Sequence, residues 1–201
     1  RYARHTANEQ KVLRLVAVFE HQMPAGLLYS LAQEGGVTDV QACVRNLVAA
    51  NLLVSSDQGT DFLARPEMRW YLLSLLLPEE RRRWHFAAGE HYRAQGVFLD
   101  AARHFRLAGA HDSSAQVLID HWRDILDDLQ VEELRDCLRE FRAMEVSGQA
   151  WARLKIIAGE VAEALDDVDT ALAEYQQALG ATDIHTKALA YYRRAKRPEL
   201  K

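Results

Sequence analysis

Hydrophobic and polar residues alternate with a helical period over most of residues 6–64. Apolar side chains recur at three- and four-residue spacings in residues 12–19 and 40–48, which predicts two amphipathic helices. A helix between them is expected to begin at Pro24, because proline suits the first helical turn, and to end at Gly35. The pattern therefore predicts three short helices near the start of the chain.

Two short apolar runs follow these helices, at residues 52–55 and 61–64. The polar, glycine-containing segment SSDQGT separates them, which is typical of a β-hairpin. Three helices followed by a hairpin is the order of a winged helix. We therefore expect a winged-helix domain over residues 1–65.

Beyond residue 65 every apolar pattern is helical. We expect a connecting helix over residues 66–81 and a series of helices over residues 82–201. Short breaks punctuate this series at Gly96, 109–111, 129–130, 147–148, 166–167 and 180–183. Antiparallel helix pairs joined by tight turns are the simplest arrangement for such spacing.

Small and aromatic residues recur in this region at an offset of 70 residues. Gly89 corresponds to Gly159, and Phe105 corresponds to Tyr175. This offset is close to twice the period of about 34 residues in tetratricopeptide repeats. Small residues let paired helices approach closely, and aromatic residues fill the space beside them. The residues predicted to pack the repeats are Gly89, Tyr92, Ala101, Phe105, Ala108, Gly159, Ala171, Tyr175 and Ala178.

The expected fold class is mainly α, a small winged-helix domain followed by an α-solenoid of tetratricopeptide-like helix pairs. The repeats are expected at residues 82–115, 116–151 and 152–185, with a truncated repeat at 186–201. The second repeat keeps the helical apolar period but lacks the small residues. A generic helical bundle is the alternative.

The segment HYRAQGVFLDAARHFRLAG at residues 91–109 resembles the regulatory half of STAND-class signalling ATPases, such as ATP-dependent regulators of the maltose-activator type. The resemblance covers residues 6–180. It implies a winged helix that braces a nucleotide-binding domain, followed by an arm that senses an inducer. It also implies that any ATPase domain lies upstream of Arg1, and no Gly-x-x-x-x-Gly-Lys-Ser/Thr motif occurs here.

The overall composition predicts the compartment in which the protein is located. The chain has 201 residues, of which 49% are hydrophobic, and a formal net charge of −4. The longest apolar run, residues 71–77, is far shorter than the roughly 20 residues that span a bilayer. With only two cysteines, both in helical patterns, we expect reduced thiols, a cytoplasmic location and no membrane partner.

A winged helix raises the question of DNA binding. The third predicted helix offers only Gln41, Arg45 and Asn46, and residues 1–64 hold five Lys/Arg against six Asp/Glu. The electrostatic attraction that drives nonspecific DNA binding is therefore absent. We do not expect nucleic acid as a partner. The alternative is a DNA-binding transcription factor domain with a helical dimerisation extension.

No residue pattern indicates catalysis, a cofactor or a metal site. His85 and His91, like His104 and His111, lack the spacing that places two ligands on one helical face. Cys43 lies on an apolar stripe, where an inert buried thiol is expected. The fragment is therefore predicted not to be an enzyme.

The expected binding surface is the concave face of the repeats. Its mixture of charged and apolar side chains suits a peptide or protein segment, and a small inducer is a further candidate. The alternative is that these are ordinary solvated positions. The candidate residues are Arg83, Phe86, Glu90 and Arg93 in the first repeat, and Arg153, Ile156, Glu160 and Glu163 in the later one.

The leading hypothesis is thus a non-catalytic regulatory or sensor fragment of a signalling ATPase or transcriptional regulator. Its expected partners are a protein or peptide segment and the nucleotide-binding domain of the parent protein. A free-standing scaffold without any ATPase is a third hypothesis.

Overall fold

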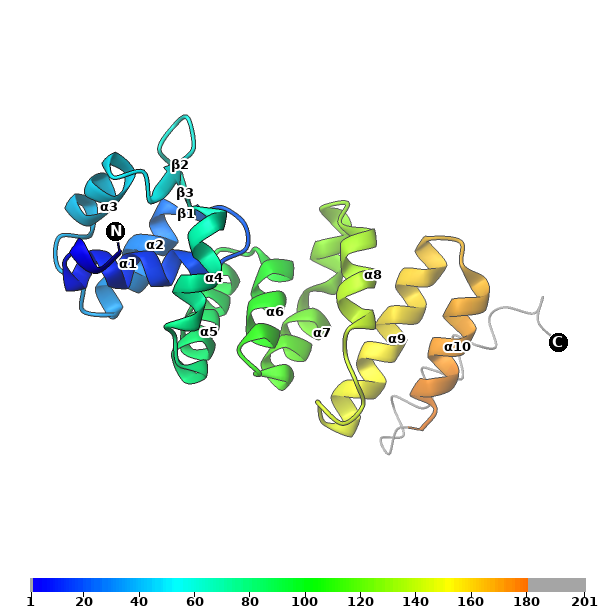
Figure 1. The fold of residues 1–201 in the computed structure, drawn as a ribbon. Helices are drawn as coiled ribbons and strands as arrows, with labels where there is room; N and C mark the ends of the chain where they lie inside the picture. The colour runs from blue at the N-terminus through cyan, green and yellow to red at the C-terminus, as the bar shows by residue number, and fades with distance from the viewer. Residues whose placement is uncertain (1, 181–201) are drawn as a thin grey trace. The chain divides into compact units, whose positions relative to one another are not determined.

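The computed structural model describes residues 2–180, which are mainly helical (Figure 1). They contain ten α-helices, one 3-10 helix and three short β-strands. The prediction of a mainly helical protein is therefore confirmed. The truncated repeat predicted at residues 186–201 lies outside the described residues.

The chain forms two compact units that meet between His91 and Tyr92. The first contains η1 (Tyr2–Arg4), α1 (Ala7–Val18), β1 (Met23–Pro24), α2 (Ala25–Glu34), α3 (Val40–Ala49), β2 (Leu53–Ser55), β3 (Asp61–Ala64) and α4 (Pro66–Ser74). The division falls within α5 (Pro78–Ala94). The second unit continues with α6 (Phe98–Leu107), α7 (His111–Asp127), α8 (Val131–Arg139), α9 (Gly148–Ala164) and α10 (Val168–Ala178).

The first unit packs three helices against a small antiparallel sheet of strand order β1-β3-β2. Thr6 and Glu9 form a capping box that begins α1, and Val12, Leu13 and Val16 are fully buried on its inner face. The hairpin of β2 and β3 was expected. β1 was not, because two residues are too few to show a strand pattern. Asp39 caps α3, because its side chain accepts a hydrogen bond from the Ala42 N–H.

The first unit extends beyond residue 65, where we expected it to end. The Arg69 Nε–H donates a hydrogen bond to the Ala17 carbonyl oxygen (3.0 Å), and Leu72 is fully buried, so α4 packs on α1. The rings of Phe19 and His85 lie 6.1 Å apart, so the first turns of α5 also belong to this unit. The expected boundary followed a change of periodicity, whereas the observed one follows the contacts of buried side chains.

Four helices, α5, α6, α7 and α9, end in the same kind of turn. The second residue after each one has a left-handed backbone conformation, at Gly96, Gly109, Leu129 and Asp166. The next N–H then bonds to a carbonyl oxygen in the last helical turn, as in a Schellman motif. These turns lie where the sequence predicted breaks; glycine adopts positive φ without steric cost at two of them, and leucine and aspartate occupy the other two.

The turns after α5 and α9 contain matching hydrogen bonds at an offset of 70 residues. The two helices therefore end in the same local geometry, although glycine occupies the left-handed position in one and aspartate in the other. The matching N–H to carbonyl bonds are Val97 to Tyr92 (3.0 Å) with Asp167 to Ala162 (2.9 Å), and Gly96 to Arg93 with Asp166 to Glu163 (both 3.1 Å).

The closest helix contact of the second unit joins α9 and α10. A Cβ atom added at Gly159 would lie only 2.3 Å from Cε1 of Tyr175, whose side chain is fully buried. Ala171 and Ala178 are buried in the same cluster as Tyr175. The ring therefore occupies the space that any larger residue at position 159 would need.

The corresponding residues of the first predicted repeat are also placed inward. Ala101 and Phe105 are fully buried, in a cluster to which α6, α7, α8 and α9 contribute. Tyr92 packs against this cluster, and its ring lies 5.3 Å from that of His104. Gly89 is buried and Ala108 is partly buried.

In the middle of the array, the helix boundaries differ from the expected repeat boundaries. A second repeat was expected to begin at residue 116, but α7 begins at His111, so residue 116 lies within this helix. The Ser114 hydroxyl, buried between helices, donates a hydrogen bond to the Ala102 carbonyl oxygen of α6 (2.6 Å). The register was missed because this repeat lacks the small residues that mark the others.

We expect Gly159→Ala to destabilise the chain by roughly 1–3 kcal/mol, because the new methyl group would overlap the Tyr175 ring. This loss would exceed the helix-propensity gain of about 1 kcal/mol. Gly148→Ala, in the first turn of the same helix with no atom within 4 Å, is the matched control and should not destabilise. Urea unfolding checks both, and equal stability of the two variants would contradict the tight contact.

Leu129→Gly is expected to stabilise the chain by about 1 kcal/mol, because leucine at φ 60° is strained. Its side chain is 87% exposed, so little packing would be lost. Gly96→Ala, at φ 76° with no atom near the added Cβ, should have the opposite effect. Thermal unfolding measures the two shifts, and a less stable Leu129→Gly protein would show that the leucine has a packing role.

Candidate functional site

An open hollow of about 370 Å³ lies against the first half of α7. We call it the α7 hollow. Arg93, from the end of α5, contributes to its lining, and Val117 contributes a buried apolar surface. The other residues that line it are Asp112, Ser113, Gln116, Asp120 and His121.

Helical spacing places the α7 side chains in two adjacent rows. Asp112, Gln116 and Asp120 are each four residues apart, and so are Ser113, Val117 and His121. Four residues rise about 6 Å along an α-helix. Alternate residues of an extended peptide are about 6.6 Å apart. The rows therefore match the repeat of a peptide lying along the helix.

Contacts within the second unit hold several of these side chains in place. The Gln116 Nε2–H donates to Asp120 Oδ1 (2.8 Å), and the Ser147 N–H donates to Asp112 Oδ1 (3.1 Å). The His121 ring stacks on Phe98, with centroids 3.7 Å apart and planes 4° apart. His121 Nδ1 also lies 3.0 Å from Asp124 Oδ2. The hollow thus presents ordered polar groups.

The charges of the α7 hollow are mixed. Within residues 2–180, Asp112 and Asp120 form no ion pair with a lysine or arginine. Arg93 supplies the positive charge, and its Cζ lies 5.9 Å from the centre of the Phe105 ring. The lining therefore contains hydrogen-bond donors, acceptors and side chains of both charges, a combination suited to a polar ligand such as a peptide.

Of the candidates predicted on α5, Arg93 lines the α7 hollow. Arg83, Phe86 and Glu90 belong to the first compact unit. Phe86 is 42% exposed, Arg83 is exposed and Glu90 is partly buried. The structure therefore groups Arg93 with α7 residues.

On α9, Arg153 is exposed, and Glu160 and Glu163 are partly buried. Ile156 was expected on the binding face, but it is 5% exposed and clusters with Ala171 and Tyr175 of α10. The expectation of a surface role for Ile156 is therefore wrong. Its apolar side chain is more stable packed between helices than in a groove.

The α7 residues are absent from the predicted binding positions. Those positions lie only where small residues mark a repeat, and α7 lies in the repeat that lacks them. The four-residue spacing of Asp112, Gln116 and Asp120 on one helical face was the available signal.

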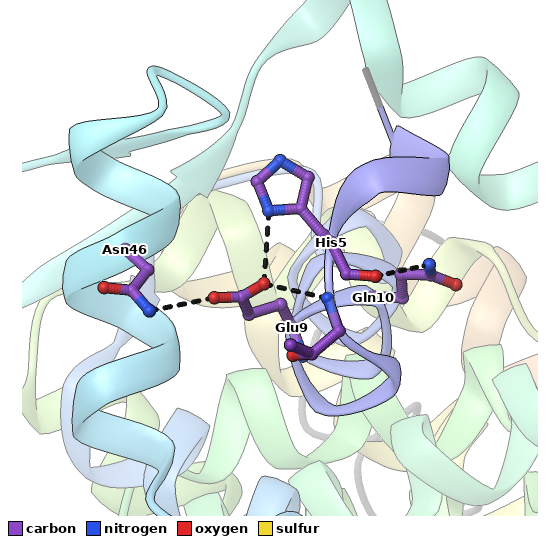
Figure 2. A network of polar contacts seen from close by, with 5 residues as sticks. His5, Glu9, Gln10 and Asn46 are labelled. Carbon is purple, nitrogen blue, oxygen red and sulfur yellow. Dashed lines mark hydrogen bonds and ion pairs between the residues drawn. The ribbon is translucent and has the colours of Figure 1, made fainter.

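The third helix of the first unit differs from a typical DNA-reading helix in one respect. The Asn46 Nδ2–H donates to Glu9 Oε1 (2.9 Å), which directs this amide toward α1 (Figure 2). Glu9 Oε2 also accepts the Thr6 N–H (2.9 Å) and lies 3.2 Å from His5 Nδ1. Gln41 and Arg45 remain exposed. Asn46 therefore holds α3 against α1.

Two cysteine thiols and one histidine ring lie in environments that disfavour their charged forms. Burial raises the pKa of the Cys43 and Cys137 thiols, which favours the unreactive protonated form. Burial also lowers the pKa of His104 to about 4, so its ring is neutral near pH 7. In the part of the chain that the structure describes, no group of three or more His, Cys, Asp and Glu side chains is placed to hold a metal ion.

Comparisons of the chain with protein-family models, characterised proteins and solved structures give no match. None of the helices within residues 2–180 has the length and apolar character needed to cross a membrane.

Glu9→Gln is expected to lower the melting temperature near pH 7, with a loss that diminishes below about pH 4. The hydrogen bonds from Asn46 and Thr6 lower the pKa of Glu9 in the folded state. Its carboxylate therefore stabilises the fold above the ordinary glutamate pKa, and protonation removes this contribution as pH falls through the folded-state value.

Melting curves of wild type and Glu9→Gln between about pH 3 and 7 test this dependence. Glu34→Gln is the matched control in the same unit, because Glu34 is exposed. A Glu9→Gln effect that stayed constant across this pH range would contradict the assigned role of the carboxylate.

Proposed function

We propose that this chain is a non-catalytic regulatory fragment in which a winged helix precedes a tetratricopeptide-like array, and that the array binds a peptide or protein segment along α7. The observation that carries this proposal is the α7 hollow, with its two rows of mainly polar side chains and Arg93. The resemblance of residues 91–109 to STAND-class regulators suggests that the segment serves signalling.

The element order of the first unit supports the winged-helix part of the proposal. Three helices and an antiparallel sheet in the order β1-β3-β2 are the elements of that fold. The matching turns after α5 and α9, and the Gly159–Tyr175 contact, support the repeat part. Such arrays stack helix pairs and leave one helix of each pair on an extended binding face.

A peptide fits the α7 hollow better than a small apolar ligand does. The hollow is lined mainly by polar side chains, and a peptide backbone requires donors and acceptors at regular intervals. The Gln116 amide and the Asp112 and Asp120 carboxylates supply them from helix positions that rise about 6 Å from one to the next. A hydrophobic inducer would instead need a largely apolar lining.

DNA binding by the first unit is the alternative function, favoured by the exposed Gln41 and Arg45 on α3. The Asn46 amide, however, bonds to Glu9 within the unit. The excess of acidic over basic residues in residues 1–64 also provides no attraction for phosphates. A role for this unit in docking to a neighbouring domain of the parent protein fits these charges better.

The peptide proposal can be tested with a displayed library of random peptides selected on the whole chain. Synthesised binders should lose affinity about tenfold or more for Arg93→Ala and for Asp120→Ala, measured by fluorescence anisotropy. Gln177→Ala, at an exposed position of α10, should bind as wild type does. Selected peptides that bind all four proteins equally would place the binding site elsewhere.

The DNA alternative is tested with the same chain and a random-sequence duplex at low salt. We expect no measurable affinity, because residues 1–64 carry no excess of positive charge. Binding that weakens steeply with added salt and is lost in Arg45→Glu would instead favour the transcription factor hypothesis.

A further inference from the structure

The first unit exposes an aromatic surface on α4. Trp70 is 79% exposed and Tyr71 is 52% exposed, and Leu77, which lies between the end of α4 and the start of α5, is 67% exposed. Single exposed apolar residues are ordinary, but a tryptophan with adjacent apolar neighbours is typical of a protein interface. The chain has four tryptophans, and Trp84 is buried while Trp122 and Trp151 are partly buried. Trp70 is thus the one exposed tryptophan.

A second open hollow, of about 610 Å³, is lined in part by Glu67, Met68 and Tyr71 of the same helix. We call it the α4 hollow. Tyr2 and Tyr71 form one wall, with their rings edge-to-face and their centroids 5.8 Å apart. Leu52, which is 3% exposed, and Met68 provide apolar surface. The volume is within the range of about 300–1,000 Å³ found for ligand pockets, so it accommodates an indole ring.

The polar groups of the α4 hollow also suit an indole. Arg65 lines it and is hydrogen-bonded to the Asn51 side chain, but within residues 2–180 it pairs with no carboxylate. A guanidinium in this state is a good partner for the face of a tryptophan ring. Glu67, also in the lining, has no Lys or Arg partner among these residues and can accept the indole N–H.

We propose that the first unit self-associates as a two-fold dimer in which Trp70 of each copy enters the α4 hollow of the other. Glu67 and Tyr71, which line the hollow, are four residues apart on α4, and Trp70 follows Glu67 by three residues, so the projecting ring lies beside the residues that line the hollow. A two-fold axis beside α4 brings both pairs together at once, as an isologous interface requires. The occupant is a second copy because this surface supplies both the hollow and the exposed indole that fits it.

The dimer is independent of peptide binding, because its residues lie in the first unit and the α7 hollow lies in the second. It adds a way of bringing two arrays together through their winged-helix ends. A single inserted side chain on each copy makes a small interface, so association at roughly micromolar concentrations is expected.

Sedimentation velocity of the whole chain, from roughly 1 to 500 μM, tests the proposal. Wild type should shift from monomer to dimer, with a blue shift of tryptophan emission as the exposed indole enters an apolar site. Trp70→Ala should raise the dimer Kd roughly thirtyfold or more, as expected for a central interface tryptophan. N-acetyl-tryptophan amide at high concentration should compete with the indole and dissociate the dimer.

Met144→Ser is the control, because Met144 is the most exposed of the large hydrophobic residues (90%) and lies in the second unit. It should dimerise as wild type does. Trp70→Ala should keep the wild-type melting temperature, since its side chain makes few contacts within the monomer. A wild-type chain that stays monomeric over this range, or one whose dimer survives Trp70→Ala, would overturn the proposal.

Discussion

The architecture of the second unit depends on how closely two helices can approach. At the pairing of α9 with α10, the absence of a side chain at Gly159 leaves the volume that the buried Tyr175 ring fills. Ala171 and Ala178 keep the surrounding surface of α10 small enough for the same approach. Because packing in a protein interior leaves almost no free volume, this one absence sets the spacing of the pair. This contact decides which face of α9 is buried, and therefore which of its side chains can be exposed.

The left-handed turns between the helices also determine how consecutive helices pair. Consecutive helices such as α9 and α10 pack side by side because the chain reverses directly after the first helix, and the residue at positive φ makes that reversal. The matching hydrogen bonds after α5 and α9 show that aspartate can occupy the same turn as glycine. Short reversals leave little chain outside the helices of the second unit. The α7 hollow accordingly lies against a helical face, with all of its lining residues except Arg93 on α7.

Much of the fold could be predicted from local sequence patterns. The helices, their breaks and the hairpin were predictable because 3.6-residue periodicity, glycine and proline act within a few residues of the chain. β1 was missed because its pairing with β3 crosses about 40 residues and leaves no local pattern in a two-residue strand. The binding residues were harder to predict from the sequence. Arg93 was named, but Ile156 proved to be buried and the α7 residues were overlooked.

The sequence alone determined the helical segments, the positions of the turns and the pairing of small with aromatic residues, because each depends on side-chain size and backbone freedom at nearby positions. Only the tertiary structure decided which polar residues meet. Asn46 and Glu9 are 37 residues apart in the chain yet share a hydrogen bond, and Arg93 reaches the same hollow as Asp120 through helix packing. Such encounters depend on the relative rotation of packed helices, which apolar burial selects over the whole unit and no short segment encodes.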